Sequence, residues 1–359
     1  MRRIAVLTSG GDAPGMNAAV RAVVKVAAAR GVEVVGVERG YRGLIDDHVR
    51  PLTRSAKGAD LAPTNEVELS ANLGGSFLGT ARCRAFYEPE GRAEAAKALA
   101  GLGSLIVIGG NGSLAGAEAL VREHGAKVIG IPASIDHDIG CTGTSIGVDS
   151  ALNTIIDACD RISDTARAHR RAFVVEVMGR QSGYLCMAGA IAAGADAALF
   201  REQGRDEDAI VRDVVSLLHR SFQDRDKERV LILKAEGVDV PCTKLVRRVQ
   251  EELGDSLDDV SIRATVLGHV VRGGRPSFAD RMVANRLAHA AVNALLDGKT
   301  GMMTAWQPPG GGEKTVDHAV RLFPFAQVLE ETRALLDGSS PVTQARVALM
   351  EKAAGVLAL

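Results

Sequence analysis

The chain has 359 residues, of which 46% are hydrophobic and 24% charged, as is ordinary for a globular protein of about two domains. Its formal net charge is −1, so no overall field favours nucleic acid or an anionic membrane as a partner. Five scattered cysteines without a CxxC pair favour a reducing cytoplasm over a disulfide framework or a zinc site. The first apolar stretch is too short for a signal peptide, and no uncharged apolar run reaches the roughly 20 residues of a membrane span.

Short β-branched runs alternate along the chain with amphipathic stretches. The runs are typical of strands buried on both faces, and the stretches are typical of helices. In chain order, we expect strands at Ile4–Leu7, Leu105–Ile108, Val128–Ile131, Phe173–Val177, Val230–Leu233 and Thr265–Leu267. We expect helices at Asn17–Ala29, Leu114–His124, Asp149–Thr165 and Phe278–Leu296. This alternation predicts a doubly wound α/β architecture.

Four of the expected strands end at glycine-rich, polar loops, which read SGGDAPG, GGNGS, PASIDHD and MGRQSG. Because parallel strands leave their C-terminal ends at one edge of a sheet, we expect these loops to share one cleft. Glycines let backbone N–H groups approach a ligand, and helix N-termini add partial positive charge, so this edge suits phosphate groups. In the first loop, Met16 and Asn17 stand where a Walker phosphate loop has lysine and serine or threonine.

Two carboxylates follow the third of these strands. Asp136 and Asp138 are two residues apart, so in an extended conformation both face the same side. One can accept a proton from a hydroxyl nucleophile, and the other can help to hold a magnesium ion. Several cations also lie beside glycine loops or strand ends, where arginine can bind phosphate through two parallel hydrogen bonds. These cations are Arg82, Arg180, Arg263, His269 and Arg272.

The segments GGDAPGMNAA (Gly10–Ala19), LGTAR (Leu78–Arg82), SIDHDIGCTGTSIG (Ser134–Gly147), VVEVMGR (Val174–Arg180) and RATVLGHVVRGG (Arg263–Gly274) together resemble the 6-phosphofructokinases. They follow the family's order and spacing over nearly the whole chain. The resemblance implies two similar doubly wound parallel-sheet domains with the active site in the cleft between them. It implies phosphoryl transfer from ATP to the 1-hydroxyl of fructose 6-phosphate in glycolysis, with Mg²⁺ as cofactor. We expect a nucleotide-binding domain of residues 1–138 plus about 252–305, and a fructose 6-phosphate-binding domain of about 139–251 plus 306–359.

The resemblance also implies roles for individual residues. Asp136 is expected to take the proton from the sugar hydroxyl, with Arg180 and Asp138 as further catalytic residues. The expected nucleotide-binding residues are Gly11, Arg82, Cys83, Gly110, Asn111, Gly112 and Ser113. The expected substrate-binding residues are Ser134, Ile135, Asp136, Arg171, Met178, Gly179, Arg180, Glu236, Arg263, His269, Val270, Val271 and Arg272. Arg171 and Arg263 match arginines that the family supplies from a neighbouring subunit, which implies a homo-oligomer, expected to be a tetramer.

Three comparisons with the family pattern bear on the donor, the metal and regulation. Pyrophosphate-using relatives typically have aspartate at Gly112 and lysine at Ala133, so both residues favour ATP. Asn111 replaces a family aspartate that helps to bind magnesium, so we expect weaker magnesium affinity, with Asp138 as a further ligand. Arg21 and Lys25 match basic residues of the allosteric site of bacterial members, although they equally fit a solvated helix face. Ser163 replaces an arginine of that site.

Three alternatives stay open at this point. The nearest is a pyrophosphate-dependent phosphofructokinase, and the second is a catalytically weak, sugar-phosphate-binding regulatory paralogue, which would explain Asn111. A nucleotide kinase such as an NAD kinase also has a GGDG-like loop, but it has no place for SIDHD and GHVVRGG. Sedoheptulose 7-phosphate is a possible second sugar, and a dimer is an alternative to the tetramer.

Overall fold

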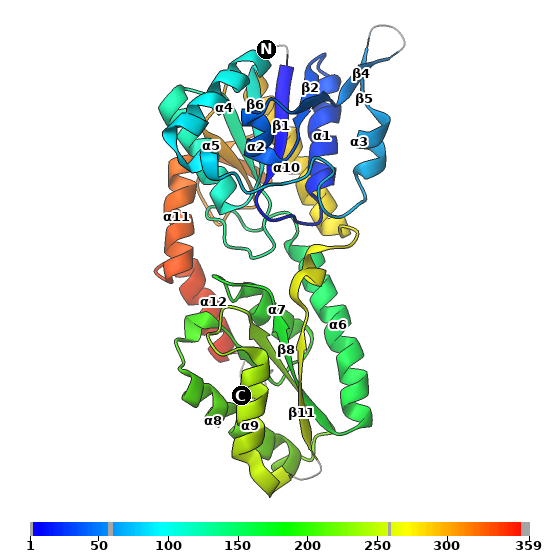
Figure 1. Ribbon diagram of the computed structural model, residues 1–359, viewed down its shortest axis with the longest axis vertical. Helices are drawn as coiled ribbons and strands as arrows, with labels where there is room; N and C mark the ends of the chain where they lie inside the picture. The colour runs from blue at the N-terminus through cyan, green and yellow to red at the C-terminus, as the bar shows by residue number, and fades with distance from the viewer. Residues whose placement is uncertain (1–2, 57–59, 258–259, 353–359) are drawn as a thin grey trace. The chain divides into compact units, whose positions relative to one another are not determined.

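The computed structural model describes residues 3–56, 60–257 and 260–352 (Figure 1). Its internal contacts divide the chain into two units, and each unit combines two separate segments. Unit 1 comprises Met1–Ser150 and Arg272–Leu335, and unit 2 comprises Ala151–Val271 and Leu336–Leu359. Each unit has helices packed against a sheet of mainly parallel strands, so the predicted α/β class is confirmed.

Unit 1 is built on an eight-stranded sheet in the order β13-β14-β12-β7-β6-β1-β2-β3. The strands are β1 (Arg3–Ser9), β2 (Glu33–Val37), β3 (Val49–Pro51), β6 (Ser104–Gly109), β7 (Val128–Pro132), β12 (Met302–Trp306), β13 (Glu313–Lys314) and β14 (Val320–Pro324). The five central strands run parallel, and antiparallel strands flank them on both sides. A separate antiparallel pair consists of β4 (Thr53–Ser55) and β5 (Leu61–Pro63).

The helices of unit 1 bury the apolar strands of this sheet. They are α1 (Met16–Ala28), α2 (Gly40–Ile45), α3 (Asn65–Ser70), α4 (Pro89–Leu102), α5 (Asn111–His124), α10 (Phe278–Leu296) and α11 (Phe325–Asp337). Side chains of α2, α4, α5 and α11 join one hydrophobic cluster with the strands, whereas α1 and α10 pack against each other. All six residues of β6 are buried, which explains why this strand has an unbroken apolar sequence.

Unit 2 is built on a four-stranded, fully parallel sheet in the order β11-β8-β10-β9. The strands are β8 (Arg171–Val177), β9 (Ala197–Leu199), β10 (Arg229–Ala235) and β11 (Ser261–Val266). The helices are α6 (Val148–Ala168), α7 (Tyr184–Ala192), α8 (Glu207–His219), α9 (Cys242–Leu253) and α12 (Pro341–Lys352). Apolar residues of α8 and α9 form a second hydrophobic core with β8, β10 and β11.

The expected elements are all present, with shifts at their ends. The helix predicted at Leu114–His124 begins three residues earlier, at Asn111, and the strand predicted at Thr265–Leu267 lies at Ser261–Val266. No helix in the described ranges is long and apolar enough to cross a membrane.

The unit boundaries differ from the predicted domain boundaries at three places. Ala133 bridges to Ile146, so the chain up to Ser150 stays with unit 1 rather than leaving it at residue 138. Strand β14 pairs with β12, which keeps residues 306–335 in the sheet of unit 1. Strand β11 pairs with β8, so most of the chain from residue 252 to 271 belongs to unit 2.

Candidate active site

Three of the four glycine-rich loops meet at one edge of the unit 1 sheet. Strand β6 lies between β1 and β7, and in this register Gly109 pairs with both Ser9 and Pro132. The loops that follow these strands therefore begin side by side. The fourth loop was wrongly expected at the same edge, because β8 pairs with β10 and β11 in the sheet of unit 2.

A cavity of about 390 Å³ lies at this edge of unit 1. All seven residues predicted to bind nucleotide line it: Gly11, Arg82, Cys83, Gly110, Asn111, Gly112 and Ser113. Ser113 sits in the first turn of α5, where the unpaired backbone N–H groups of a helix favour an anion. The cavity thus combines backbone donors, a helix N-terminus and an exposed arginine, which together suit a polyphosphate.

An aromatic pair forms part of the same cavity. The rings of Tyr41 and Phe86 stack with centroids 3.9 Å apart, and the Tyr41 hydroxyl donates to the Ser113 carbonyl oxygen over 2.6 Å. Burial raises the pKa of the Tyr41 phenol, so it stays a neutral donor. A Cβ atom at Gly116 would lie 2.8 Å from the Phe86 ring and 3.0 Å from the Tyr41 ring. Glycine at this position therefore leaves room for the stack.

Asp138 joins two of the loops through hydrogen bonds to its carboxylate. Ser134 Oγ donates to Asp138 Oδ1 over 2.9 Å, and Asn111 Nδ2 donates to Asp138 Oδ2 over 2.7 Å. Burial raises the pKa of the Asp138 carboxyl, and both hydrogen bonds oppose that shift. The side-chain oxygen of Asn111 is buried and accepts no hydrogen bond from the described residues. Two oxygen-bearing side chains thus meet where the GGNGS and SIDHD loops touch.

The SIDHD loop is not extended, so that part of the sequence prediction was wrong. Ile135 and Asp136 form a turn, and His137 has a φ of 49° in the left-handed region. Within this turn, Ile135 and His137 are buried, while Asp136 between them is partly exposed. The Asp136 backbone N–H donates to Ser134 Oγ over 3.3 Å, and the same hydroxyl donates to Asp138. Ser134 therefore ties both aspartates into one turn.

In unit 2, a cavity of about 310 Å³ lies where β8 and β10 end. Of the predicted substrate residues, Met178 and Glu236 line it, while Arg180 and His269 are exposed and do not. The Gly237 N–H donates to the Gly179 carbonyl over 3.2 Å, which ties the two strand-end loops together.

Lys234 at the floor of this cavity was missed by sequence reasoning. Its side chain is only 1% exposed, and Nζ lies 3.0 Å from Glu176 Oε2 and 3.1 Å from the Ala235 carbonyl oxygen. Lys234 and Glu176 occupy paired positions on β10 and β8, so the ion pair crosses two neighbouring strands.

The predicted substrate residues belong to both units. Those in unit 1 are Ser134, Ile135, Asp136 and Arg272, and those in unit 2 are Arg171, Met178, Gly179, Arg180, Glu236, Arg263, His269, Val270 and Val271. Arg272 packs on the first glycine loop, where its Nη1 donates to the Asp12 carbonyl oxygen over 3.1 Å. Val270 is 60% exposed, whereas Val271 is fully buried.

Arg171 and Arg263 share one face of the unit 2 sheet. Arg263 pairs in register with Phe173, two residues after Arg171, so the three side chains emerge on the same side. Arg171 is separated from Val177 by six residues of β8, which is about 20 Å along an extended strand. An arginine side chain cannot cover that distance to reach the loop at Met178 in its own chain.

The predicted allosteric residues lie on α1 of unit 1. Arg21 is bonded to Glu68 of α3, and Lys25, one turn later, is exposed. Their i, i+4 spacing and exposure are equally compatible with an ordinary solvated helix face.

Comparison with known proteins identifies the family of this chain. A family model described as phosphofructokinase matches residues 3–295. The chain belongs to the phosphofructokinase family. It is 46% identical to the ATP-dependent 6-phosphofructokinase of Thermotoga neapolitana over 311 residues, covering 86% of this chain and 90% of the relative. It is 42% identical to ATP-dependent 6-phosphofructokinase 1 of Thermus thermophilus over 344 residues, covering 94% of this chain and 98% of the relative.

A solved phosphofructokinase structure from Saccharomyces cerevisiae resembles the whole chain. It is 30% identical with a TM-score of 0.78, and the match covers 99% of this chain and 48% of the yeast chain. The chain therefore spans about half the length of that yeast protein. These phosphofructokinase relatives support the α/β architecture and the family inferred from the five sequence segments.

Some residues that line the cavities lie outside the glycine motifs, so sequence analysis did not predict them. Tyr41, Phe86 and Arg92 line the unit 1 cavity but lie outside the glycine loops. The segment LGTARCRAF offered one clue, because Phe86 follows the predicted Arg82 by four residues. Lys234 stood out only as a single charge inside the apolar run VLILKA.

Proposed function

We propose that this chain is an ATP-dependent 6-phosphofructokinase. It transfers a phosphoryl group from ATP to the 1-hydroxyl of fructose 6-phosphate, giving fructose 1,6-bisphosphate and ADP in glycolysis. The observation that carries the proposal is the 2.7 Å hydrogen bond from Asn111 to Asp138. It joins the loop that lines the unit 1 cavity to the loop that bears Asp136, which supports a phosphate donor and a proton acceptor at one sheet edge.

The donor assignment to ATP is supported by what lines the unit 1 cavity. The stacked aromatic pair and the apolar residues around it offer a surface to a nucleoside base, which pyrophosphate lacks. Gly112 also lines the cavity, and a Cβ atom there would meet nothing within 4 Å. An aspartate would therefore fit sterically, but its charge would oppose the nucleotide phosphates. Glycine at 112 leaves that space to ATP.

Mg²⁺ fits the donor set of unit 1. Magnesium takes hard oxygen ligands, and two are present here: the Asp138 carboxylate and the buried Asn111 amide oxygen, which accepts no hydrogen bond from the described part of the chain. A single carboxylate suffices when nucleotide phosphates and water complete the octahedron. Bound there, the ion would neutralise charge on the transferred phosphoryl group. No group of three or more His, Cys, Asp or Glu side chains within the described residues offers another site.

The protein's own residues supply positioning and proton transfer. Asp136 accepts the proton of the sugar 1-hydroxyl, while Ser134 fixes the turn that presents it. Arg180 and Arg272 bring positive charge toward the sugar phosphate and the transferred phosphoryl group, and His269 offers a further hydrogen-bonding group. Met178 and Glu236 line the unit 2 cavity. Unit 1 thus binds the nucleotide, and unit 2 provides most of the sugar-phosphate contacts.

The oligomer is proposed to be a tetramer with subunit-shared active sites. Arg171 and Arg263 lie on one face of β8 and β11, too far along the strands to reach the Met178 loop of their own chain. Their charges can serve a sugar phosphate only from a second copy of the chain. We place the enzyme in the cytoplasm, which the five free thiols fit.

A coupled assay of fructose 6-phosphate with either ATP or pyrophosphate, with magnesium titrated, tests the proposal. Turnover with ATP that is lost in Asp136→Asn supports it, and turnover that requires pyrophosphate contradicts it. One observation favours a second candidate, a sugar-phosphate-binding regulatory paralogue: Asn111 brings no charge to the metal and donates to Asp138. Tight fructose 6-phosphate binding without turnover would establish that candidate instead.

A further inference from the structure

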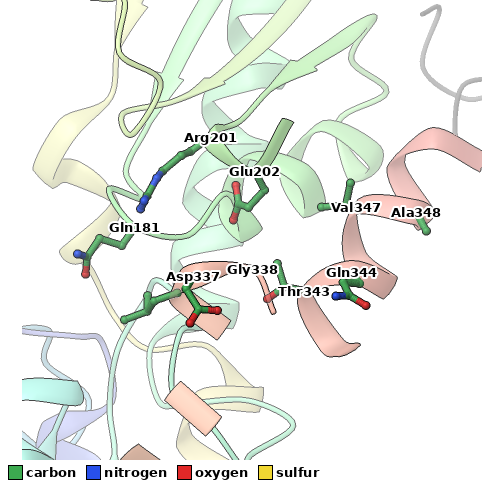
Figure 2. A pocket seen from close by; sticks show the side chains of 10 residues that line it. Gln181, Arg201, Glu202, Asp337, Gly338, Thr343, Gln344, Val347 and Ala348 are labelled. Carbon is green, nitrogen blue, oxygen red and sulfur yellow. The ribbon is translucent and has the colours of Figure 1, made fainter. Parts of the chain in front are cut away.

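Unit 2 contains a second, larger cavity of about 490 Å³ that none of the predicted site residues lines (Figure 2). One wall is formed by Gln181, Arg201 and Glu202, and the other by the end of α11, the turn after it and helix α12. Its polar lining comes from Gln181, Arg201, Glu202, Asp337, Thr343 and Gln344, with Val347 and Ala348 as apolar neighbours.

Glu202 is the unusual group in this cavity. Its Oε1 accepts the Gly183 N–H over 2.7 Å, but its Oε2 is buried and has no hydrogen-bond partner within the described residues. A buried carboxylate oxygen without a donor is costly, and such atoms are rare in folded proteins. Figure 2 shows the carboxylate directed into the cavity, and Asp337 adds a second negative charge to the lining. This part of the cavity calls for a cationic donor.

The opposite charge lies on another side of the same cavity. Arg201 is adjacent to Glu202 in sequence, yet its guanidinium extends toward Gln181 and away from Glu202 in Figure 2. In the part of the chain that the structure describes, that guanidinium makes no hydrogen bond or ion pair. The cavity therefore presents a separate cationic group and a separate anionic group. Guanidinium binds carboxylate through two parallel hydrogen bonds, so this side suits an anion.

We propose that this cavity is a binding site for a free amino acid. The ammonium group is held by Glu202 and Asp337, the carboxylate by Arg201, and the side chain lies against Val347, Ala348 and the amides of Gln181 and Gln344. A zwitterion satisfies both lining charges at once, which neither an amine nor a carboxylic acid can do. Neither Arg21 nor Lys25, the residues expected at the allosteric site, lines this cavity.

Glu202 also connects the cavity to the loop that carries Arg180. Gly183 ends that loop, and a Cβ there would lie 2.6 Å from Glu202 Oε2 and from Phe200 Cβ, so the carboxylate packs directly on the backbone. An ammonium group held between the Glu202 and Asp337 carboxylates fixes Glu202 against Gly183 and so steadies the Met178–Gly183 loop. We expect an occupied cavity to lower the KM for fructose 6-phosphate a few-fold. This effect rests on the proposed function, whereas the proposal that the cavity binds an amino acid does not.

Calorimetry and thermal shift on the full chain test the site. Each of the twenty standard amino acids is titrated singly, and the tightest ligand is compared with its decarboxylated amine and its deaminated acid. We expect saturable binding of one amino acid per chain, and binding at least roughly tenfold weaker for either analogue, because each lacks one charged hydrogen-bonding group. Absence of saturable binding by all twenty overturns the proposal, as does equal binding of an analogue.

Variants locate the binding in this cavity. Glu202→Gln keeps an acceptor for the Gly183 N–H but removes the charge, and Arg201→Gln removes the cation; each should weaken binding at least roughly tenfold. The matched control is Glu207→Gln, the same change five residues later, where the carboxylate pairs with Lys244 and Arg248 outside the cavity. Binding that survives Glu202→Gln overturns the site. If an amino acid binds but leaves the KM for fructose 6-phosphate unchanged, only the proposed effect of the cavity on the Arg180 loop is overturned.

Discussion

The strand-end loops of unit 1 and unit 2 form their cavities with different chemistry. In unit 1, the glycine loops and the Tyr41–Phe86 pair line the cavity, and the Asp138 carboxylate, which bonds to Asn111 of that lining, is held by neutral donors. In unit 2, a buried ion pair between Lys234 and Glu176 forms the cavity floor, and Glu236 and Asp239 add further acidic groups. A backbone-lined site leaves a glycine signature in the sequence, whereas a cross-strand ion pair leaves none.

This difference also divides the proposed labour. If the unit 1 edge binds the donor phosphates beside Asp136, as proposed, changes there should lower kcat or weaken binding of the nucleotide and its metal. The unit 2 edge supports sugar-phosphate contacts, so changes there should raise the KM for fructose 6-phosphate or lower stability. Each of the following variants changes one of the two edges and tests whether only the properties assigned to that edge change.

Asp136→Asn should have the largest effect. Loss of a general base lowers kcat by about 10²- to 10⁴-fold, while the KM for ATP should change little because Asp136 does not line the nucleotide cavity. Steady-state kinetics with both substrates varied measures the two constants. Asp157→Asn, on the exposed face of α6, is the matched control and should keep full activity. A kcat for Asp136→Asn close to that of the unaltered chain would remove the proposed base.

Lys234→Met should destabilise unit 2 by about 3–5 kcal/mol, because Glu176 would keep a buried charge without its partner. Adding Glu176→Gln should restore most of that loss and leave a folded enzyme with a raised KM for fructose 6-phosphate. Urea denaturation measures the free energy of unfolding. Lys244→Met breaks an exposed pair with Glu207 and should cost less than about 1 kcal/mol. Equal costs for the two lysines would contradict the contrast between the edges.

Asn111→Asp should move the magnesium requirement, an effect confined to the unit 1 edge. It replaces the amide that donates to Asp138 with a second carboxylate, so repulsion lowers the melting temperature in EDTA and Mg²⁺ with ATP restores it. A further unit charge about 4 Å from the ion contributes about 1–4 kcal/mol, so the magnesium midpoint should fall at least fivefold. Asn285→Asp on the exposed face of α10 is the control. An unchanged midpoint would exclude Asn111 from the metal site.

Sequence analysis succeeded where a local pattern of residues specifies the structure. Helix α10 was predicted at its observed bounds, Phe278–Leu296, and in the structure Ser277 caps its start by accepting the Asp280 N–H. The loops after β1, β6 and β7 were predicted at one edge because each strand is short, apolar and ends in glycines or small polar residues. Local patterns of this kind are sufficient for elements and glycine loops.

The errors arose where long-range pairing decides the structure. The sheet that β8 joins depends on its partners β10 and β11, which no residue of β8 specifies. The turn at Ile135 is held by hydrogen bonds of the Ser134 hydroxyl with Asp136 and Asp138, which the apolar pattern of the strand before it does not indicate. The Tyr41–Phe86 stack joins residues 45 positions apart, so neither ring alone indicates it.

Gly116→Ala tests that stack and should have the smallest effect of the four. The added methyl group would lie 2.8 Å from the Phe86 ring and 3.0 Å from the Tyr41 ring, so the rings must shift at a cost of about 1–3 kcal/mol. Alanine in a helix offsets part of this cost by up to about 1 kcal/mol. We therefore expect a KM for ATP raised several-fold and a nearly unchanged KM for fructose 6-phosphate, measured by steady-state kinetics.

Gly101→Ala in α4 is the control that separates the clash with the rings from the helix preference for alanine. A Cβ there meets nothing within 4 Å, so only the helix preference for alanine acts, and stability should rise slightly with both KM values unchanged. If Gly116→Ala behaved like Gly101→Ala, the stacked rings would not shape the nucleotide cavity. Base recognition would then have to come from groups outside the stack, and the unit 1 edge would depend on backbone donors alone.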